Sequence, residues 1–215
     1  DSNVGGGCIG LDVPAKVRKT VGLTNLLASP EWSKRKGSLP CCPAIDVYGN
    51  PVVFDIADLP HIIIAGTTGS GKSVFMNAML LSLMASGADF RLIIADGKGE
   101  DFAPHYARSS RLMQDMADDS GDIPAIATDA ETIKRQVLWI TAEMDSRFAT
   151  GEKPYPIIFV TDELADIVMQ DGKDKAITKA IARISQKARS AKISMMLATQ
   201  YPVTKVIDPI IAVNT

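Results

Sequence analysis

The chain has 215 residues, of which 46% are hydrophobic, and its formal net charge is −2. This length and composition are sufficient for one α/β core, and the slightly acidic balance excludes a globally basic nucleic-acid-coating protein. No apolar run approaches the roughly 20 residues that span a bilayer, and no signal peptide begins the chain. The three cysteines, which lack metal-ligand spacing, favour neither a disulfide framework nor a zinc site: Cys8, Cys41 and Cys42. We therefore expect a soluble segment from a reducing compartment that makes no membrane contact itself.

The first quarter of the chain differs in composition from the rest. Residues 1–10 are rich in glycine, and the stretch to Pro60 combines Pro, Gly and charge clusters with short apolar runs. Turn residues at 48–51 precede the apolar run 52–54, which predicts one arm of a β-hairpin. We divide the chain into an N-terminal tail and lead-in segment at 1–55 and a main domain at 56–215.

A glycine-rich loop follows the first buried strand of the main domain. The strand is expected at Ile62 to Ala65 and a helix from Gly71 to about Ser86, and the sequence between them has the pattern G-x-x-x-x-G-K-S. Its glycines let the backbone turn tightly enough to aim amide groups at phosphate oxygens, and the helix N-terminus adds the positive end of a dipole. The flanking strand and helix favour a phosphate-binding loop over a chance Gly/Thr-rich turn.

This loop predicts ATP and Mg²⁺ as ligands. Lys72 is expected to reach the β- and γ-phosphates, and the Ser73 hydroxyl is expected to contact Mg²⁺. We expect the nucleotide to be bound by the whole run from residue 66 to residue 74: Gly66, Thr67, Thr68, Gly69, Ser70, Gly71, Lys72, Ser73 and Val74.

The rest of the main domain alternates between strands and helices. Strands are expected at 90–95, 157–160 and 193–198, and helices from a capping box at Thr128–Glu131 onward and at about 176–189. The helix that follows the capping box has a predicted core face: Ile133, Val137, Ile140, Met144 and Phe148. Residues 114–124 are acidic and polar, and we expect a surface loop there. The alternation predicts a mainly parallel sheet flanked by helices, with ligands at the carboxyl ends of the strands.

Two adjacent carboxylates follow the apolar strand at 157–160. Asp162 is predicted to hold Mg²⁺, directly or through water, and Glu163 to polarise a water molecule in line with the γ-phosphate. Acids at strand ends are also common as caps and turn formers. In a chain with a phosphate-binding loop, however, the pair favours a Walker B motif, and therefore a hydrolase over a passive nucleotide binder.

Two further strand ends have polar residues. Gln200 follows the strand at 193–198, and it would sense the γ-phosphate or orient water if this strand neighbours the one before the phosphate-binding loop. An ordinary polar strand terminus is the alternative. Asp96 and Lys98 end another parallel strand with the same ambiguity, and we rank them lower.

Four positively charged residues are spaced four positions apart, and the series begins at the residue before the helix at 176–189. We call this set the basic stripe: Lys175, Lys179, Arg183 and Lys187. Apolar residues fall on the opposite side of the helix, so one face is basic and the other faces the core. A solvated face, a surface for nucleic-acid phosphates and a contact with a neighbouring subunit are the alternatives.

Together these motifs resemble the motor domain of the FtsK/SpoIIIE DNA translocases. The resemblance extends over most of residues 10–214 and includes residues 46–53, 60–73, 161–166, 186–189 and 197–200. It implies a RecA-like P-loop ATPase core, a homo-hexameric ring when the domain is complete, and ATP-driven movement along double-stranded DNA in the bacterial cytoplasm, with a membrane anchor possible outside this segment. It also makes Arg189 a candidate finger for the ATP of the neighbouring subunit. The expected catalytic residues are then Lys72, Asp162, Glu163, Arg189 and Gln200.

The sequence departs from the family pattern at two positions. Family members typically have an arginine after the Ala-Thr-Gln segment and a lysine about eleven residues later, both associated with DNA contact. This chain has Tyr201 and Ala212 there, and Lys205 replaces the charge in part. The chain also stops at Thr215, where the family continues, so we expect a motor domain truncated at its C-terminus. DNA translocation is the leading interpretation. A secretion or conjugation ATPase that moves protein or nucleoprotein, and a nucleotide-switched assembly module, are the alternatives.

Overall fold

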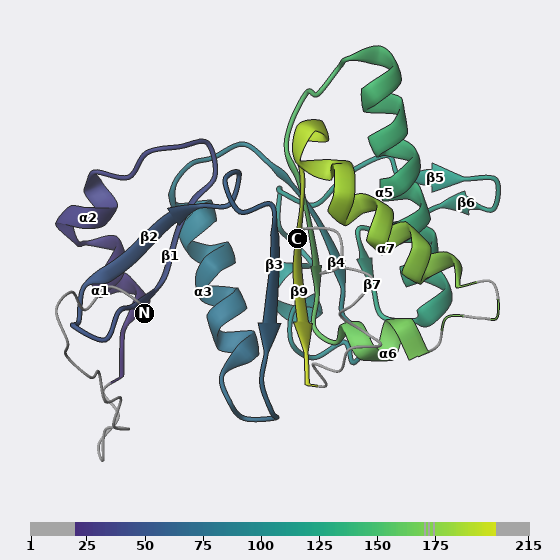
Figure 1. Ribbon diagram of the computed structural model, residues 1–215. Coiled ribbons are helices and arrows are strands. Elements are labelled where there is room, and N and C mark those ends of the chain that lie inside the picture. The colour runs from purple at the N-terminus through teal and green to yellow at the C-terminus, as the bar shows by residue number, and fades with distance from the viewer. Residues whose placement is uncertain (1–19, 170, 172, 174, 201–215) are drawn as a thin grey trace, which may run out of the picture.

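The computed structural model describes residues 20–169, 171, 173 and 175–200 of the chain. The lead-in forms two short helices and a hairpin, and the main domain forms a sheet between two layers of helices (Figure 1). Three residues at which the family pattern is altered lie outside the described residues: Tyr201, Lys205 and Ala212.

The lead-in contains the predicted hairpin. Its strands pair antiparallel. The Asp46 carboxylate closes the turn by accepting the amides of Tyr48 and Asn50, each at 2.8 Å, and Gly49 has the positive φ of 91° that this turn requires. The elements of the lead-in are α1 (Leu23–Leu27), α2 (Pro30–Ser33), β1 (Pro40–Ile45) and β2 (Pro51–Asp55).

Five parallel strands form the central sheet, in the order β3-β9-β8-β4-β7. Their bounds are β3 (His61–Ala65), β4 (Arg91–Ala95), β7 (Ile126–Ala127), β8 (Ile157–Thr161) and β9 (Ile193–Thr199). Every residue of β8 and β9 is buried, as expected for parallel strands with both faces covered. The arrowheads of β3 and β9 point to the same end of the molecule in Figure 1. The predicted α/β fold with a mainly parallel sheet is confirmed.

Helices cover both faces of this sheet. The first layer contains α3 (Lys72–Ala85) and α4 (Ala103–Tyr106), and the second contains α5 (Ala130–Thr150), α6 (Leu164–Met169), α7 (Ala176–Lys187) and the 3₁₀ turn η1 (Ala188–Ala191). Alternate residues of β8 face the two layers: Phe159 belongs to the core under α5 and α7, whereas Ile158 belongs to the core under α3. Leu39 and Cys41 of the lead-in pack into the α3 core as well. The boundary after residue 55 stays a prediction.

The second helix layer begins and ends differently from the sequence-based expectation. Asp129, and not Thr128, is the N-cap of α5, because its carboxylate accepts the Thr132 amide at 2.9 Å. The predicted capping box was therefore one residue out of register. Phe148, assigned to the core face of α5, is 44% exposed. At the other end of the layer, α7 stops at Lys187 and the chain tightens into η1.

The acidic segment at 114–124 is also more ordered than the predicted surface loop. It forms a small hairpin of β5 (Ala117–Asp118) and β6 (Gly121–Asp122). Met116 and Ile123 flank this hairpin and are buried in the core under α5. Two apolar anchors thus hold an otherwise exposed turn against the domain.

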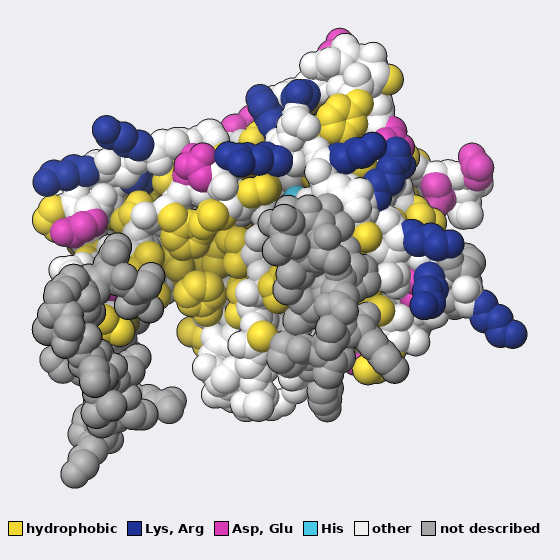
Figure 2. Space-filling model, in the orientation of Figure 1, with side chains coloured by type: hydrophobic (Ala, Val, Ile, Leu, Met, Phe, Trp, Pro, Cys, Tyr) yellow, Lys and Arg dark blue, Asp and Glu magenta, His cyan; other side chains and the backbone are white. Residues whose placement is uncertain are grey.

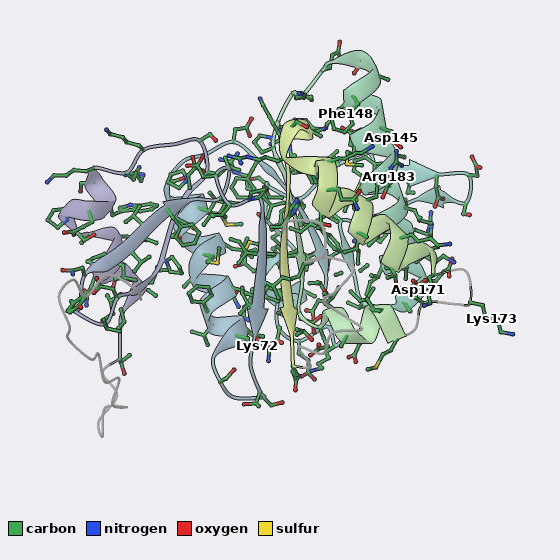
Figure 3. The ribbon with its side chains drawn as sticks, viewed as in Figure 1. Lys72, Asp145, Phe148, Asp171, Lys173 and Arg183 are labelled. Carbon is green, nitrogen blue, oxygen red and sulfur yellow. The ribbon has the colours of Figure 1, made fainter. Side chains whose placement is uncertain are left out.

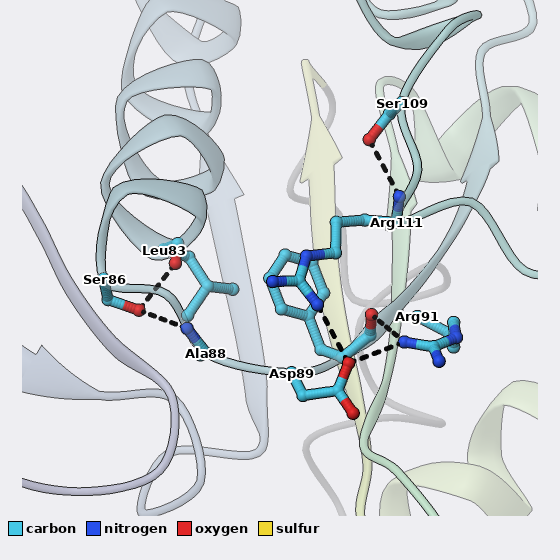
Figure 4. A network of polar contacts seen from close by, with 8 residues as sticks. Leu83, Ser86, Ala88, Asp89, Arg91, Ser109 and Arg111 are labelled. Atoms are coloured by element: carbon cyan, nitrogen blue, oxygen red, sulfur yellow. Dashed lines mark hydrogen bonds and ion pairs between the residues drawn. The ribbon is translucent and has the colours of Figure 1, made fainter.

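A polar network orders the connection from α3 to β4 (Figure 4). Ser86 Oγ donates to the Leu83 carbonyl at 2.6 Å and accepts the Ala88 amide at 3.1 Å. Asp89 then pairs with Arg91 at 2.8 Å and with Arg111 at 2.9 Å. Because Asp89 is exposed, these ion pairs add little stability.

Within the described ranges, no helix has both the length and the apolar character needed to cross a membrane. Cys41 and Cys42 are buried free thiols. Nor does the described part of the chain contain a group of three or more His, Cys, Asp or Glu side chains that could hold a metal ion.

Candidate nucleotide-binding site

The glycine-rich loop connects β3 to α3 at the carboxyl edge of the sheet. Gly69 and Gly71 have φ angles of 75° and 97°, which other residues rarely adopt. A Cβ atom at Gly66 would lie 2.5 Å from Ser70 Oγ, so a side chain there would displace the Ser70 hydroxyl. The first bond of α3 runs from the Phe75 amide to the Gly71 carbonyl at 2.9 Å, which leaves the preceding amides without an intrahelical acceptor. The loop therefore has the form of an anion cradle at a helix N-terminus.

Lys72 begins α3 and folds back over the loop. Its Nζ donates to the Gly66 carbonyl at 2.7 Å and lies 3.5 Å from the Thr67 carbonyl oxygen. In Figure 3, Lys72 lies at the end of the molecule toward which β3 and β9 point. The ammonium group is thus held against the loop backbone, where phosphate oxygens could replace the two carbonyls. Ser73, the next residue, occupies the second position of α3.

Asp162 follows β8, and its two carboxylate oxygens have different environments. Oδ1 accepts the Gly97 amide at 3.2 Å, whereas Oδ2 is buried and has no hydrogen-bond partner among the described residues. Burial, assisted by the negative charge of Asp96, raises the pKa of Asp162 to about 6. A cation beside Oδ2 would offset the cost of this buried charge, and carboxylate oxygen is a ligand that Mg²⁺ prefers. The environment of Asp162 therefore fits the predicted metal ligand.

Glu163 is 4% exposed and is held by the end of β9. Its Oε1 accepts the Thr199 hydroxyl at 2.8 Å, and its Oε2 accepts the Gln200 amide at 3.0 Å. Because β9 lies between β3 and β8, these bonds fix the carboxylate beside the strand that neighbours the phosphate-binding loop. A restrained orientation is what a group that positions a water molecule needs.

Gln200 joins β9 to the phosphate-binding loop. Its side-chain Oε1 accepts the Thr68 hydroxyl at 2.7 Å. Ala65 and Thr199 are opposite each other in the β3–β9 register, and the Gly66 amide donates to the Thr199 carbonyl at 3.2 Å. The strand of Gln200 thus neighbours the strand before the loop, which was the condition for its predicted role. Three separate sequence motifs meet at this edge of the sheet.

Thr199 and Asp96 also support the site, although the sequence patterns did not single out Thr199 and ranked Asp96 low. Thr199 supplies the hydroxyl that holds Glu163. Asp96 is fully buried, and its Oδ2 accepts the amides of Phe102 and Ala103 at 2.9 and 2.8 Å. The Asp96 carboxylate is therefore occupied by hydrogen bonds to the loop that follows β4. A polar residue at a strand end was the available signal in both cases, and it does not tell a supporting residue from a ligand.

Arg189 does not join the other predicted site residues. It lies in η1, which precedes β9, whereas the nucleotide motifs follow the strands. At about 3.3 Å per residue, the seven residues of β9 separate it from the carboxyl edge by roughly 20 Å. The Arg189 side chain is 66% exposed, and its guanidinium lies 3.9 Å from the Asp58 carboxylate. Within one chain, Arg189 is out of reach of the phosphate-binding loop.

The basic stripe lies on the exposed side of α7, where Figure 2 shows Lys and Arg side chains along the helix. Arg183 differs from the three lysines because its guanidinium makes two bonds to the Asp145 carboxylate of α5, at 2.6 and 2.8 Å. Figure 3 shows this pair beside Phe148, far from Lys72. Part of the stripe therefore has a structural partner inside the chain.

Comparison with curated proteins shows similarity to DNA-translocating relatives. DNA translocase SftA of Bacillus subtilis (strain 168) is 32% identical over 229 residues, an alignment that covers 96% of this chain and 23% of that protein. DNA translocase FtsK 2 of Neisseria meningitidis is 33% identical over 248 residues, with the same two coverages. The chain thus spans about a quarter of the length of these relatives.

Solved structures show the same fold at low identity. The conjugation coupling protein TcpA of pCW3, in its monomer form with ATPγS, gives a TM-score of 0.66 at 19% identity over 86% of this chain and 55% of that one. The type VII secretion ATPase EccC of Thermomonospora curvata gives 0.61 at 18% identity over 90% of this chain and 26% of that one. A family model described as FtsK/SpoIIIE matches residues 22–150 and 148–204. Because this match extends over most of the chain, the protein belongs to the FtsK/SpoIIIE family.

Proposed function

We propose that the protein is an ATP-hydrolysing motor that moves double-stranded DNA as a ring-shaped homo-hexamer. The observation that supports ATP hydrolysis best is the continuous contact from Glu163 through Gln200 to Thr68. It connects the carboxylate that would activate water with the loop that would hold the γ-phosphate. A protein that only binds nucleotide does not need this connection.

Each residue of the site has a proposed role. The loop amides and Lys72 bind the phosphates of ATP, and Ser73 and Asp162 hold the accompanying Mg²⁺. When bound, Mg²⁺ neutralises phosphate charge. Glu163 accepts a proton from the attacking water, while Gln200 orients that water or detects the γ-phosphate through its contact with the loop.

The proposal of DNA as the substrate rests on the family and on its relatives. The relatives from Bacillus subtilis and Neisseria meningitidis are both named DNA translocases. A ring is supported by the distance of Arg189 from its own phosphate-binding loop, because an exposed arginine at the other edge of the sheet would be free to meet the nucleotide of a neighbouring subunit. Such an arginine stabilises charge that develops on the γ-phosphate.

A secretion or conjugation ATPase that moves protein or nucleoprotein is the second candidate. The sequence observation that favours it is the replacement of two family positions associated with DNA contact by Tyr201 and Ala212. A nucleotide-switched assembly module is a third candidate, in which turnover matters less than the bound state.

DNA-stimulated ATP hydrolysis by the assembled full-length protein separates these candidates. We expect linear double-stranded DNA to raise the turnover rate severalfold, and Lys72→Ala to remain inactive at every DNA concentration. A rate of ATP hydrolysis that does not change with DNA but rises with a protein or nucleoprotein substrate would favour the second candidate. Binding of ATP without turnover in demonstrably assembled protein would favour the third.

A further inference from the structure

The loop that follows β4 is organised by Asp96. Its Oδ1 accepts the Gly99 amide at 3.0 Å, and its Oδ2 accepts the amides of Phe102 and Ala103. The adjacent Gly97 donates its amide to Asp162 Oδ1 at 3.2 Å. One end of this loop therefore contacts Asp162, the proposed metal ligand that follows β8. The buried carboxylate of Asp96 holds the rest of the loop through the amides of the residues that lead into α4.

The other end of the loop reaches α3. Tyr106 closes α4 and is 3% exposed. Its hydroxyl donates to Asn77 Oδ1 at 2.9 Å, and Asn77 Nδ2 donates to the Ser73 carbonyl at 2.9 Å. The Tyr106 hydroxyl is protonated at neutral pH and can donate this bond, and burial raises its pKa further, to about 12. The ring packs against Phe102, with ring centroids 6.3 Å apart.

These contacts connect the two sides of the site a second time, outside the sheet. Ser73 follows β3 and Asp162 follows β8, and β9 lies between those strands, so the two strands are roughly 10 Å apart. We propose that the segment Asp96–Tyr106 is a brace that holds Ser73 and Asp162 at the separation that Mg²⁺–ATP requires. Tyr106 and Asn77 are its positioning residues. The inference rests on the proposed function, because it assigns Ser73 and Asp162 to one metal ion.

The brace acts on the metal-dependent part of nucleotide binding. ATP without Mg²⁺ contacts the loop amides and Lys72, which do not depend on the distance to Asp162. Mg²⁺ needs both sides of the site at once, because small octahedral cations tolerate little error in ligand position. Loss of one bond in the brace should therefore weaken Mg²⁺ binding and leave the metal-free affinity for ATP nearly unchanged.

Tyr106→Phe tests this with the smallest change, because it removes the hydroxyl and keeps the ring in the core. We expect the Mg²⁺ concentration for half-maximal tight ATP binding to rise about three- to tenfold, the range that one net hydrogen bond supports. ATP affinity in EDTA should stay within about twofold. Tyr155→Phe is the matched control: it removes a hydroxyl from a partly buried tyrosine just before β8, and it should leave both values unchanged.

Asn77→Ala provides a second variant that is safe for the fold, because alanine favours a helix. It should shift the Mg²⁺ midpoint in the same direction as Tyr106→Phe. The double variant should shift it no further than the larger single change, since both substitutions interrupt the same chain of contacts. Additive shifts, an unchanged Mg²⁺ midpoint in Tyr106→Phe, or an equal loss of affinity with and without Mg²⁺ would overturn the brace.

The experiment also separates this inference from the proposed function. If the wild-type protein shows no tight Mg²⁺–ATP binding, or if Asp162→Ala leaves the Mg²⁺ dependence unchanged, the proposed function itself fails. If Asp162→Ala weakens the Mg²⁺ dependence while Tyr106→Phe and Asn77→Ala both match the wild type, the brace alone is wrong.

Discussion

The Thr199 hydroxyl donates a 2.8 Å hydrogen bond to the carboxylate of Glu163, a residue 36 positions earlier in the chain. The bond joins the ends of β9 and β8, which are neighbours in the sheet. Because both residues are buried, the carboxylate has little freedom to rotate. Its orientation is set before any ligand arrives, which is the condition for activating a water molecule with a fixed base.

The first prediction concerns Glu163→Gln. The amide has nearly the same shape and can retain an oxygen at the position of Oε1, which accepts both the Thr199 hydroxyl at 2.8 Å and the Gln200 amide at 3.1 Å. The amide cannot take a proton from water. We expect ATP affinity close to that of the wild type and turnover reduced by roughly 10²- to 10⁴-fold, the usual contribution of a general base. Titration with ATP and steady-state hydrolysis on the same preparation provide the measurement. If turnover stays at the wild-type level, another residue activates the water.

The second prediction separates the two sides of the phosphate site. Lys72→Ala should abolish tight Mg²⁺–ATP binding, because it removes the cation held against the loop by the Gly66 carbonyl. Asp162→Ala should weaken the dependence of ATP binding on Mg²⁺ while ATP alone still binds. Thermal unfolding without nucleotide checks that both variants remain folded. Near-normal Mg²⁺–ATP affinity in folded Lys72→Ala would remove the basis for the phosphate-binding interpretation.

A site residue could be predicted from the sequence when it belongs to a short local motif, but not when its role depends on contacts between elements that are far apart in the chain. Lys72 and Ser73 lie within one short motif between a strand and a helix, so spacing alone was sufficient to propose them. The Glu163–Thr199 and Tyr106–Asn77 bonds depend on which strands and helices become neighbours, and no local pattern encodes that. The sequence therefore predicted the strand–helix alternation and the motif residues, but not the side chains that hold them in place.

Local errors have similarly physical causes. Thr128 and Asp129 are both good N-cap residues, and the three-residue spacing to Glu131 made Thr128 look like a capping box. In the structure, the Asp129 carboxylate accepts the hydrogen bond from the Thr132 amide, so Asp129 is the N-cap. Phe148 continues the apolar period of α5, but it lies near the helix end, beside the exposed Arg183–Asp145 pair (Figure 3).

The third prediction is a pH dependence that arises from His61. Neither ring nitrogen has a hydrogen-bond partner within the described part of the chain, and burial lowers the pKa of His61 from 6.5 to about 4. Between these values the unfolded chain binds more protons than the folded one, so this contribution to stability is complete above pH 6.5 and is lost as the pH falls toward 4. Its slope is at most about 1.4 kcal/mol per pH unit.

His61→Phe should remove this contribution, so the stability difference between the variant and the wild type should change across the same pH window. Chemical unfolding at several pH values between 7 and 4 provides the measurement. His105, which is exposed, supplies the control: His105→Asn should follow the wild-type curve. A His61→Phe curve parallel to the wild type throughout would mean that folding does not change the protonation of His61.

The fourth prediction concerns DNA and the basic stripe. Contacts between lysines and phosphates release counterions, so each contact adds about one unit to the slope of log affinity against log salt. Replacing Lys175, Lys179 and Lys187 by Gln should therefore lower that slope by up to about three units. Arg183→Gln is the comparison within the stripe, and we expect a smaller effect because Asp145 already pairs with Arg183. An unchanged slope in the triple variant would favour a solvated face or a subunit contact.

The last prediction is that Arg189 acts on the ATP of a neighbouring subunit. It lies at the amino edge of β9, exposed and roughly 20 Å from its own phosphate-binding loop by strand length. Arginine fingers in other P-loop enzymes contribute on the order of a thousandfold or more in rate. Arg189→Ala should therefore keep ATP binding and lose most hydrolysis. The alternative is a structural arginine near the end of a helix, worth under about 1 kcal/mol.

Mixed assemblies decide between these roles for Arg189. When Arg189→Ala subunits are combined with Lys72→Ala subunits, some interfaces contain an intact loop from the first and an intact arginine from the second, so part of the turnover should return. A mixture of Arg189→Ala with the double variant Lys72→Ala/Arg189→Ala is the matched control, because no interface in it has an intact arginine, and it should stay inactive. Because the finger and its target then come from different chains, recovery in the first mixture alone requires action across the interface. Full activity of Arg189→Ala by itself, or no recovery in rings shown to be mixed, would assign Arg189 a structural role.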